Sequence, residues 1–92
     1  MMQHRLYVGL NNGETVLDVE KEVAQFIAAA TIYSGRGLWQ GSSEPCVIVE
    51  VVGEDKLNGT AAIVESLARH LRHRFHQTCV LYTRQHVESK LI

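Results

Sequence analysis

The sequence is short of several features that mark common classes of protein. It has one proline and two cysteines in 92 residues, and Cys46 and Cys79 do not share a Cys-x-x-Cys spacing. We interpret both as small apolar side chains in strands of a protein from a reducing compartment. No apolar run is long enough to span a bilayer, and the N-terminus lacks the apolar core of a signal peptide. We therefore expect a cytoplasmic protein with no membrane partner.

An excess of charge of one sign is also missing. Nine basic and ten acidic residues give a formal net charge of -1, so no overall positive field attracts nucleic acid or an anionic membrane. The 46% hydrophobic and 21% charged content is typical of a folded protein. At this length the chain is expected to form a single domain, 1–92, with one modest core.

The most apolar stretch is 45–53, Pro-Cys-Val-Ile-Val-Glu-Val-Val-Gly. Its β-branched residues favour a strand, and the flanking proline and glycine make it too short for a buried helix. Because only Glu50 interrupts the apolar run, this strand is expected at the centre of a sheet. A strand that is apolar on both sides needs cover on both of its faces.

Other elements follow from periodicity and turn residues. Apolar residues alternate in the first strand, and they recur at helical spacing after Thr15 or Asp18 and again after residue 59. Glycines at 35, 37 and 41 predict a second strand that is weakened or bulged, joined to the third by a short turn. The predicted elements are strands at 2–10, 31–40, 45–53 and 78–86, helices at about 18–30 and 60–76, and frayed residues at 87–92.

The order strand, helix, strand, strand, helix, strand predicts a ferredoxin-like α+β fold. Both helices then cover one face of a four-stranded antiparallel sheet and leave the other open. If Val47, Val49 and Val51 point to the helices, the open face is largely apolar with charges at its centre. Its expected residues are Arg5, Tyr7, Trp39, Cys46, Ile48, Glu50, Val52, Val80 and Tyr82.

Two resemblances to known families rest on short motifs. Residues 6–11, Leu-Tyr-Val-Gly-Leu-Asn, resemble the first-strand signature of RNA-recognition motifs, in which an aromatic residue such as Tyr7 stacks on a base. The second signature of that family, basic and aromatic, is absent from the third strand, so we expect no specific nucleic-acid binding. Residues 31–41 followed by 44–51 resemble the second and third strands of PII-like proteins, although the long signalling loop of that family is missing.

The PII-like resemblance implies a sheet face buried in an oligomer, as does a general similarity to dimeric α+β barrel proteins and to small uncharacterised proteins of bacteria or phage. We expect a homo-oligomer formed through the open sheet face. The chain is then an interaction or small-ligand-binding protein. The alternative is a small dimeric α+β barrel enzyme with an active site between subunits.

A small polar ligand is the other candidate occupant of the open face. Arg36, Glu50 and Tyr7 could surround a cavity with Trp39, although Arg5 or Arg36 pairing with Glu50 across strands is the simpler reading. No strand-to-helix elbow, phosphate loop or paired-carboxylate motif supports catalysis, and no cofactor is expected. The candidate ligand or interface residues are Tyr7, Arg36, Trp39, Ile48, Glu50 and Tyr82.

The histidines at 70, 73 and 76 have a spacing that would suit two zinc ligands on one helix face. No third ligand completes a pattern nearby, so we expect no metal. We interpret His73 and His76, with Arg69 and Arg72, as a solvated basic face near a helix C-terminus, where positive charge also favours the helix dipole.

Overall fold

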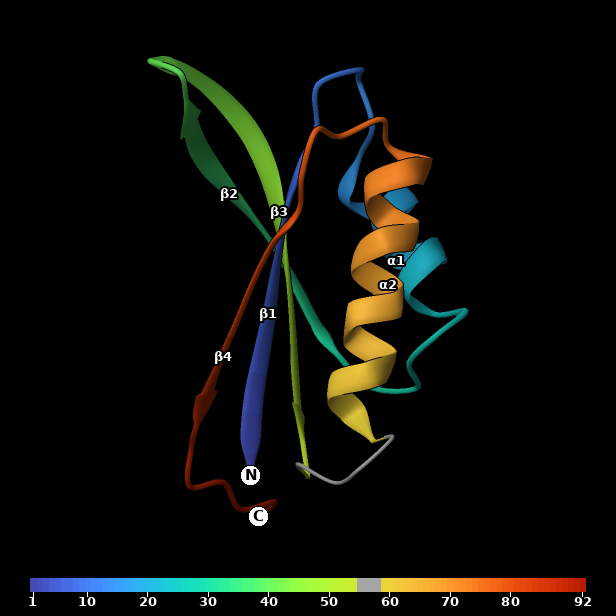
Figure 1. Cartoon of the computed structure of the whole chain (residues 1–92), viewed down its shortest axis with the longest axis vertical. Helices are drawn as coiled ribbons and strands as arrows, with labels where there is room; N and C mark the ends of the chain where they lie inside the picture. Colours follow the sequence, from blue (N-terminus) through green and yellow to red (C-terminus); the bar gives the residue numbers. More distant parts are fainter. Residues whose placement is uncertain (55–58) are drawn as a thin grey trace.

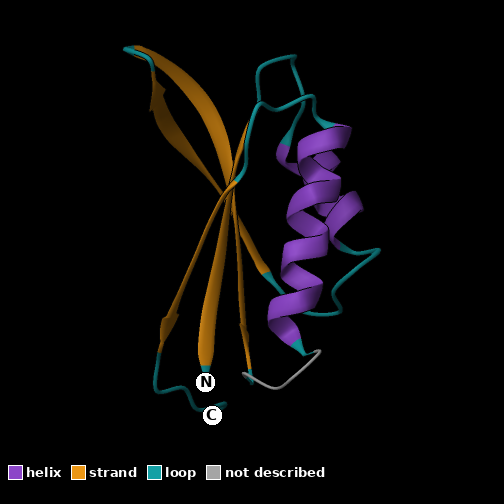
Figure 2. Ribbon diagram, viewed as in Figure 1, coloured by secondary structure: helices purple, strands orange, loops and turns teal. Residues whose placement is uncertain are grey.

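The structure is a computed structural model that describes residues 1–54 and 59–92. Its described residues form four strands and two helices in the predicted order (Figures 1 and 2). In this part of the chain, neither helix combines the length and apolarity needed to cross a membrane. The elements are β1 (Met2–Gly9), α1 (Val16–Val23), β2 (Thr31–Trp39), β3 (Ser42–Gly53), α2 (Thr60–Arg74) and β4 (Leu81–His86).

The sheet is antiparallel throughout and has the order β2-β3-β1-β4. Both helices lie on one side of it (Figure 1). This arrangement confirms the predicted ferredoxin-like fold, with the apolar β3 beside β1 at the centre of the sheet. We call the side away from the helices the open face.

The core lies between the helices and the covered side of β1 and β3. Alternate residues of the two central strands point into it, where they meet the apolar stripe of α2. Ile63 was expected in that stripe but is 43% exposed, because it lies on the flank of the helix. The buried core consists of Leu6, Val8, Leu10, Val19, Val23, Val47, Val49, Val51, Val64, Leu67, Leu71 and Phe75.

Several element boundaries differ from the sequence prediction, among them the start of β3, which lies at Ser42 instead of 45. Helix α1 ends at Val23, because the backbone bonds of Gln25 and Phe26 reach back three residues instead of four. Strand β4 begins at Leu81, three residues later than expected.

Helix α1 begins with a reciprocal capping box between Thr15 and Asp18. The Asp18 carboxylate accepts a hydrogen bond from the Thr15 backbone N–H, and this bond lowers the pKa of Asp18.

The pairing of β4 with β1 fixes which of its side chains point to the helices. Tyr82 pairs with Leu6, packs against the core, and its hydroxyl lies 2.6 Å from Nδ1 of buried His4. Val80 also packs against the core. The prediction that Val80 and Tyr82 lie on the open face was therefore wrong, and Leu81, 59% exposed, occupies that side instead.

The connection between β2 and β3 is a tight turn at Gln40 and Gly41. Both residues have positive φ, 49° and 81°, which is the conformation that two-residue hairpin loops need and that glycine adopts without strain. The predicted bulge in β2 is wrong, since pairing runs without a break from Thr31 to Trp39. The hairpin extends beyond the helices and bends away from them (Figure 1).

A charged contact joins the two helices across their exposed side. The Glu22 carboxylate of α1 accepts bonds from Arg74 Nε at 2.8 Å and His70 Nε2 at 3.3 Å. Its side chain is only 13% exposed, and the hydrogen bond to His70, followed by that to Arg74, lowers the pKa of Glu22. His70, one of the three histidines considered as metal ligands, thus contacts the other helix.

We predict that Glu22→Gln lowers the free energy of unfolding by about 0.5 to 1 kcal/mol at pH 6. Because the folded state lowers the pKa of Glu22, its contribution is present above the ordinary carboxyl pKa of about 4.3 and is lost as the pH falls through the folded-state value. Urea unfolding of both proteins between pH 6 and pH 3 measures this. Glu65→Gln is the control, because Glu65 pairs with Arg69 in the same helix and both are largely exposed. Equal effects of the two substitutions would contradict the prediction.

Candidate functional site

A hollow lies on the open face, where the β2–β3 hairpin bends past the segment that leads from α2 to β4. Its volume is about 440 Å³, within the range of small-molecule sites. We call it the hairpin cavity. It is lined by Tyr7, Gly9, Asn11, Gly35, Arg36, Gly37, Leu38, Trp39, Glu44, Cys46, Ile48, His76, Gln77, Thr78, Cys79 and Leu81.

The floor of the hairpin cavity is made of glycine. Gly9 of β1 and Gly35 of β2 are the two partners of Cys46 in β3, so they flank its side chain in one row across the sheet. Gly37 and Glu44 form a row nearer the turn. A Cβ at position 35 would lie 2.8 Å from Ile48 Cδ1, too close for an undisturbed contact. The absence of a side chain at Gly35 therefore lets Ile48 and Cys46 pack over this strand, whereas a Cβ at Gly37 would meet only ordinary contacts.

Apolar side chains form the walls. Ile48 lies between its cross-strand partners Tyr7 and Tyr33 and is only 7% exposed, although it is on the open face. Nearer the turn, Trp39 is 50% and Leu38 75% exposed. An exposed aromatic wall suits a planar ring, which can stack on it.

Two oxygen atoms meet above Gly9. A Cβ placed on this glycine would lie 2.6 Å from Gln77 Oε1 and 2.9 Å from Glu44 Oε1. Within residues 1–54 and 59–92, Glu44 has neither an ion pair nor a hydrogen bond, and the neighbouring Arg36 donates to Ser43 Oγ at 2.8 Å. The Glu44 carboxylate thus has no ion-pair partner among the described residues, although Arg36 also lines the cavity, and such a carboxylate favours a cationic ligand.

Both thiols of the protein face this cavity. Cys46 is half-buried on β3 and Cys79 is exposed in the segment before β4. Burial, together with the negative charge of Glu44, raises the pKa of Cys46, so its sulfur is protonated at neutral pH. Cys46 therefore acts as part of the cavity surface and not as an activated nucleophile.

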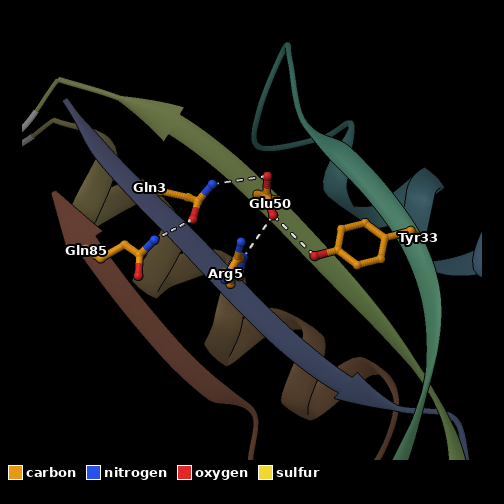
Figure 3. Close-up of polar contacts among 5 residues, drawn as sticks. All are labelled: Gln3, Arg5, Tyr33, Glu50 and Gln85. Carbon is orange, nitrogen blue, oxygen red and sulfur yellow. Dashed lines mark hydrogen bonds and ion pairs between the residues drawn. The ribbon is translucent and has the colours of Figure 1, made fainter. Parts of the chain in front are cut away.

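A chain of polar contacts crosses the rest of the open face (Figure 3). Glu50 accepts bonds from Arg5 Nε at 2.9 Å, Tyr33 Oη at 3.2 Å and Gln3 Nε2 at 3.2 Å. Gln85 Nε2 of β4 donates to Gln3 Oε1 at 3.1 Å. Partial burial, followed by the bond to Glu50, raises the pKa of Tyr33, which keeps its hydroxyl protonated. All four strands contribute to this open-face polar chain.

The predicted site residues fall into three groups. Tyr7, Arg36, Trp39 and Ile48 all line the hairpin cavity. Glu50 does not, because it pairs with Arg5, the simpler of the two readings of the sequence. Tyr82 lies on the other side of the sheet, as described above.

Several cavity residues were not predicted as site residues. Glu44 was assigned to the turn and the glycines to a bulge, whereas the strands continue through both. Gly35 and Gly37 share one face of β2, and this alternation was the available signal. Gln77 could not be found from the sequence, since only the chain path after α2 brings it above Gly9.

The histidines of α2 do not converge on further ligands. No group of three or more His, Cys, Asp or Glu side chains suited to a metal ion occurs among the described residues. His70 instead contacts Glu22 and packs against the ring of Phe26, with centroids 5.0 Å apart.

Comparisons with known proteins place this fold among solved structures. No protein-family model matches the chain. No curated protein matches its sequence. A phage SAM lyase in the apo state matches with a TM-score of 0.77 and 28% identity over 91% of this chain and 78% of the lyase chain. A phage SAM lyase in complex with S-methyl-5'-thioadenosine matches with a TM-score of 0.75 and 24% identity over 91% of this chain and 79% of that chain.

The chain therefore shares its fold with small phage proteins, in agreement with the expected similarity to small proteins of bacteria or phage. Those structures include a small molecule bound to this fold. The resemblances to PII-like, α+β barrel and RNA-binding proteins stay predictions.

We predict that the two thiols differ in reactivity. In Cys79→Ser, the remaining Cys46 should react with iodoacetamide several-fold more slowly at pH 8 than Cys79 does in Cys46→Ser, because burial and a raised pKa lower the thiolate fraction of Cys46. The difference should narrow as the pH rises. Mass spectrometry of timed samples measures both rates, and equal rates at pH 8 would refute the assigned surroundings of Cys46.

Proposed function

We propose that this protein binds a sulfonium nucleoside of the S-adenosylmethionine (SAM) type in the hairpin cavity. The observation that carries the proposal is the carboxylate of Glu44, which lines a largely apolar cavity and has no ion-pair partner among the described residues. A sulfonium is a cation that donates no conventional hydrogen bond, so it needs a negative charge nearby more than it needs a directional partner. The SAM lyase neighbours support this choice of ligand.

The rest of the cavity suits the nucleoside part of such a ligand. The adenine ring is planar and could stack on the aromatic side chain of Trp39, beside Gly37, where a Cβ would meet only ordinary contacts. Glu44 is close enough to the floor that a sulfonium attached to the ribose would lie next to its carboxylate. The apolar walls keep water from screening this contact.

Isothermal titration calorimetry with SAM tests the binding. We expect Glu44→Gln, which keeps the shape of the side chain and removes its charge, to weaken binding about 10-fold or more. Glu14→Gln is the matched control, because Glu14 is outside the cavity and its carboxylate bonds the Asn12 backbone. A wild-type protein that does not bind SAM, or a Glu44→Gln variant that binds it equally well, would refute the proposal.

Cleavage of the bound SAM is a second candidate, favoured by the fold shared with SAM lyases. Breaking the bond between the sulfonium sulfur and the methionine γ-carbon leaves the electron pair on sulfur and releases neutral S-methyl-5'-thioadenosine. The γ-carbon then needs a new electron pair. In one reaction the carboxylate oxygen of the methionine part supplies the pair and closes a lactone. In the other, the C–H bond on the neighbouring carbon supplies it, a double bond forms, and Glu44 accepts the proton. Chromatography of the products after incubation with SAM separates a lactone, an unsaturated amino acid and unchanged substrate.

We also propose that copies of the chain associate through the open face. Apolar side chains remain exposed there, among them Leu81 at 59% and Val52 at 43%. The same face carries both a cation, Arg5, and a carboxylate, Glu50, so it can complement a second copy of itself about a two-fold axis. Burial of apolar surface at about 25 cal/mol per Å² would offset part of the entropic cost of association.

We predict that Val52→Asp dissociates this oligomer, because the new carboxylate would be buried without a partner. Light scattering at micromolar concentration should report more than one chain for the wild type and one for the variant. Ile63→Asp is the matched control, since Ile63 is also 43% exposed but lies on α2, on the other side of the sheet. A wild-type protein with the mass of one chain would disprove the association.

A further inference from the structure

We propose that Gln77 is a specificity residue of the hairpin cavity, and that its carbonyl oxygen acts with the Glu44 carboxylate to favour a sulfonium over the corresponding neutral thioether. This inference rests on the proposed function, because it concerns how the same cavity selects its ligand. Its starting point is that both oxygens flank one position above Gly9.

The backbone after α2 holds Gln77 in place. The helix ends in a Schellman motif, in which the Gln77 N–H donates to Arg72 O at 2.9 Å and the His76 N–H to His73 O at 3.3 Å. The residue in the left-handed position of this motif is usually glycine, but here it is His76, with φ of 52°. A non-glycine residue in this conformation is strained, and the two backbone bonds oppose that strain. The position of Gln77 is therefore set by the end of the helix.

A hydrogen bond also determines which end of the Gln77 amide faces the ligand. Its Nε2 donates to Phe75 O at 3.1 Å, and a backbone carbonyl can accept but not donate. The amide nitrogen is thereby directed to the protein, and Oε1 is the atom close to Gly9. The cavity therefore presents an amide oxygen beside a carboxylate oxygen, and both are acceptors.

A pair of acceptors distinguishes ligands by charge. A sulfonium between these oxygens is attracted by the Glu44 charge and by the negative end of the Gln77 carbonyl dipole. A neutral thioether of the same shape gains neither attraction and still removes water from both oxygens. The cavity should consequently hold SAM more tightly than S-adenosylhomocysteine, which differs by one methyl group and the positive charge.

The test compares the dissociation constants of SAM and S-adenosylhomocysteine by calorimetry in the wild type and in Gln77→Leu. We expect the wild type to prefer SAM, and Gln77→Leu to reduce that preference about 3- to 10-fold. Gln77→Glu, which adds a negative charge next to Glu44, should increase it. Gln85→Leu is the control, because Gln85 lies on the open face outside the cavity and should leave the ratio unchanged.

The ratio of the two constants is the informative quantity, because a general loss of structure would weaken both ligands together. Gly9→Ala gives a second measurement, since its Cβ would push both oxygens away from their common position and should also reduce the preference. If the wild type binds neither ligand, the proposed function itself is wrong. If it binds both equally, or if the ratio survives Gln77→Leu, the role of Gln77 is refuted while the binding site stands.

Discussion

The constraint on which this structure depends is that its two helices cover only one side of a four-stranded sheet. The valines of β3 and the even-numbered residues of β1 fill the covered side, and their burial supplies the main apolar contribution to the core. Every residue between them must then face outward, including Ile48 and Glu50. The open face is therefore a product of the same alternation that builds the core, and the hairpin cavity forms where this face bends.

Local patterns were sufficient to predict the architecture. The alternation in β1, the helical spacing in α2 and the proline and glycine around β3 each indicate one element, and their order indicates one fold. The ends of the helices and strands were predicted less accurately, because α1 ends through a change in hydrogen bonding and β4 starts three residues later than expected. The side assigned to Tyr82 was wrong because the sequence does not show the register in which β4 pairs with β1, and a one-residue change of register exchanges the two faces of a strand.

The candidate site was predicted only in part, for a physical reason. Tyr7, Trp39 and Ile48 are on strands whose faces follow from periodicity, and all three line the cavity. Arg36 also lines it, although alternation places Arg36 on the opposite side of β2 from Trp39. The oxygens above Gly9 come from two segments more than thirty positions apart, and the chain after α2 has no periodic pattern. Their meeting depends on how the helix ends, which a pattern of apolar residues does not encode.

The open-face polar chain helps to specify the register of the strands on the side that the helices do not touch. Gln85, Gln3, Glu50 and Tyr33 are each one strand apart, and every contact among them requires the observed pairing. A slip of one residue in any strand would turn its polar member into the core and an apolar neighbour out to water. Apolar packing on the helix side and polar contacts on the open face therefore favour the same register. A mispaired sheet would lose both sets of contacts at once.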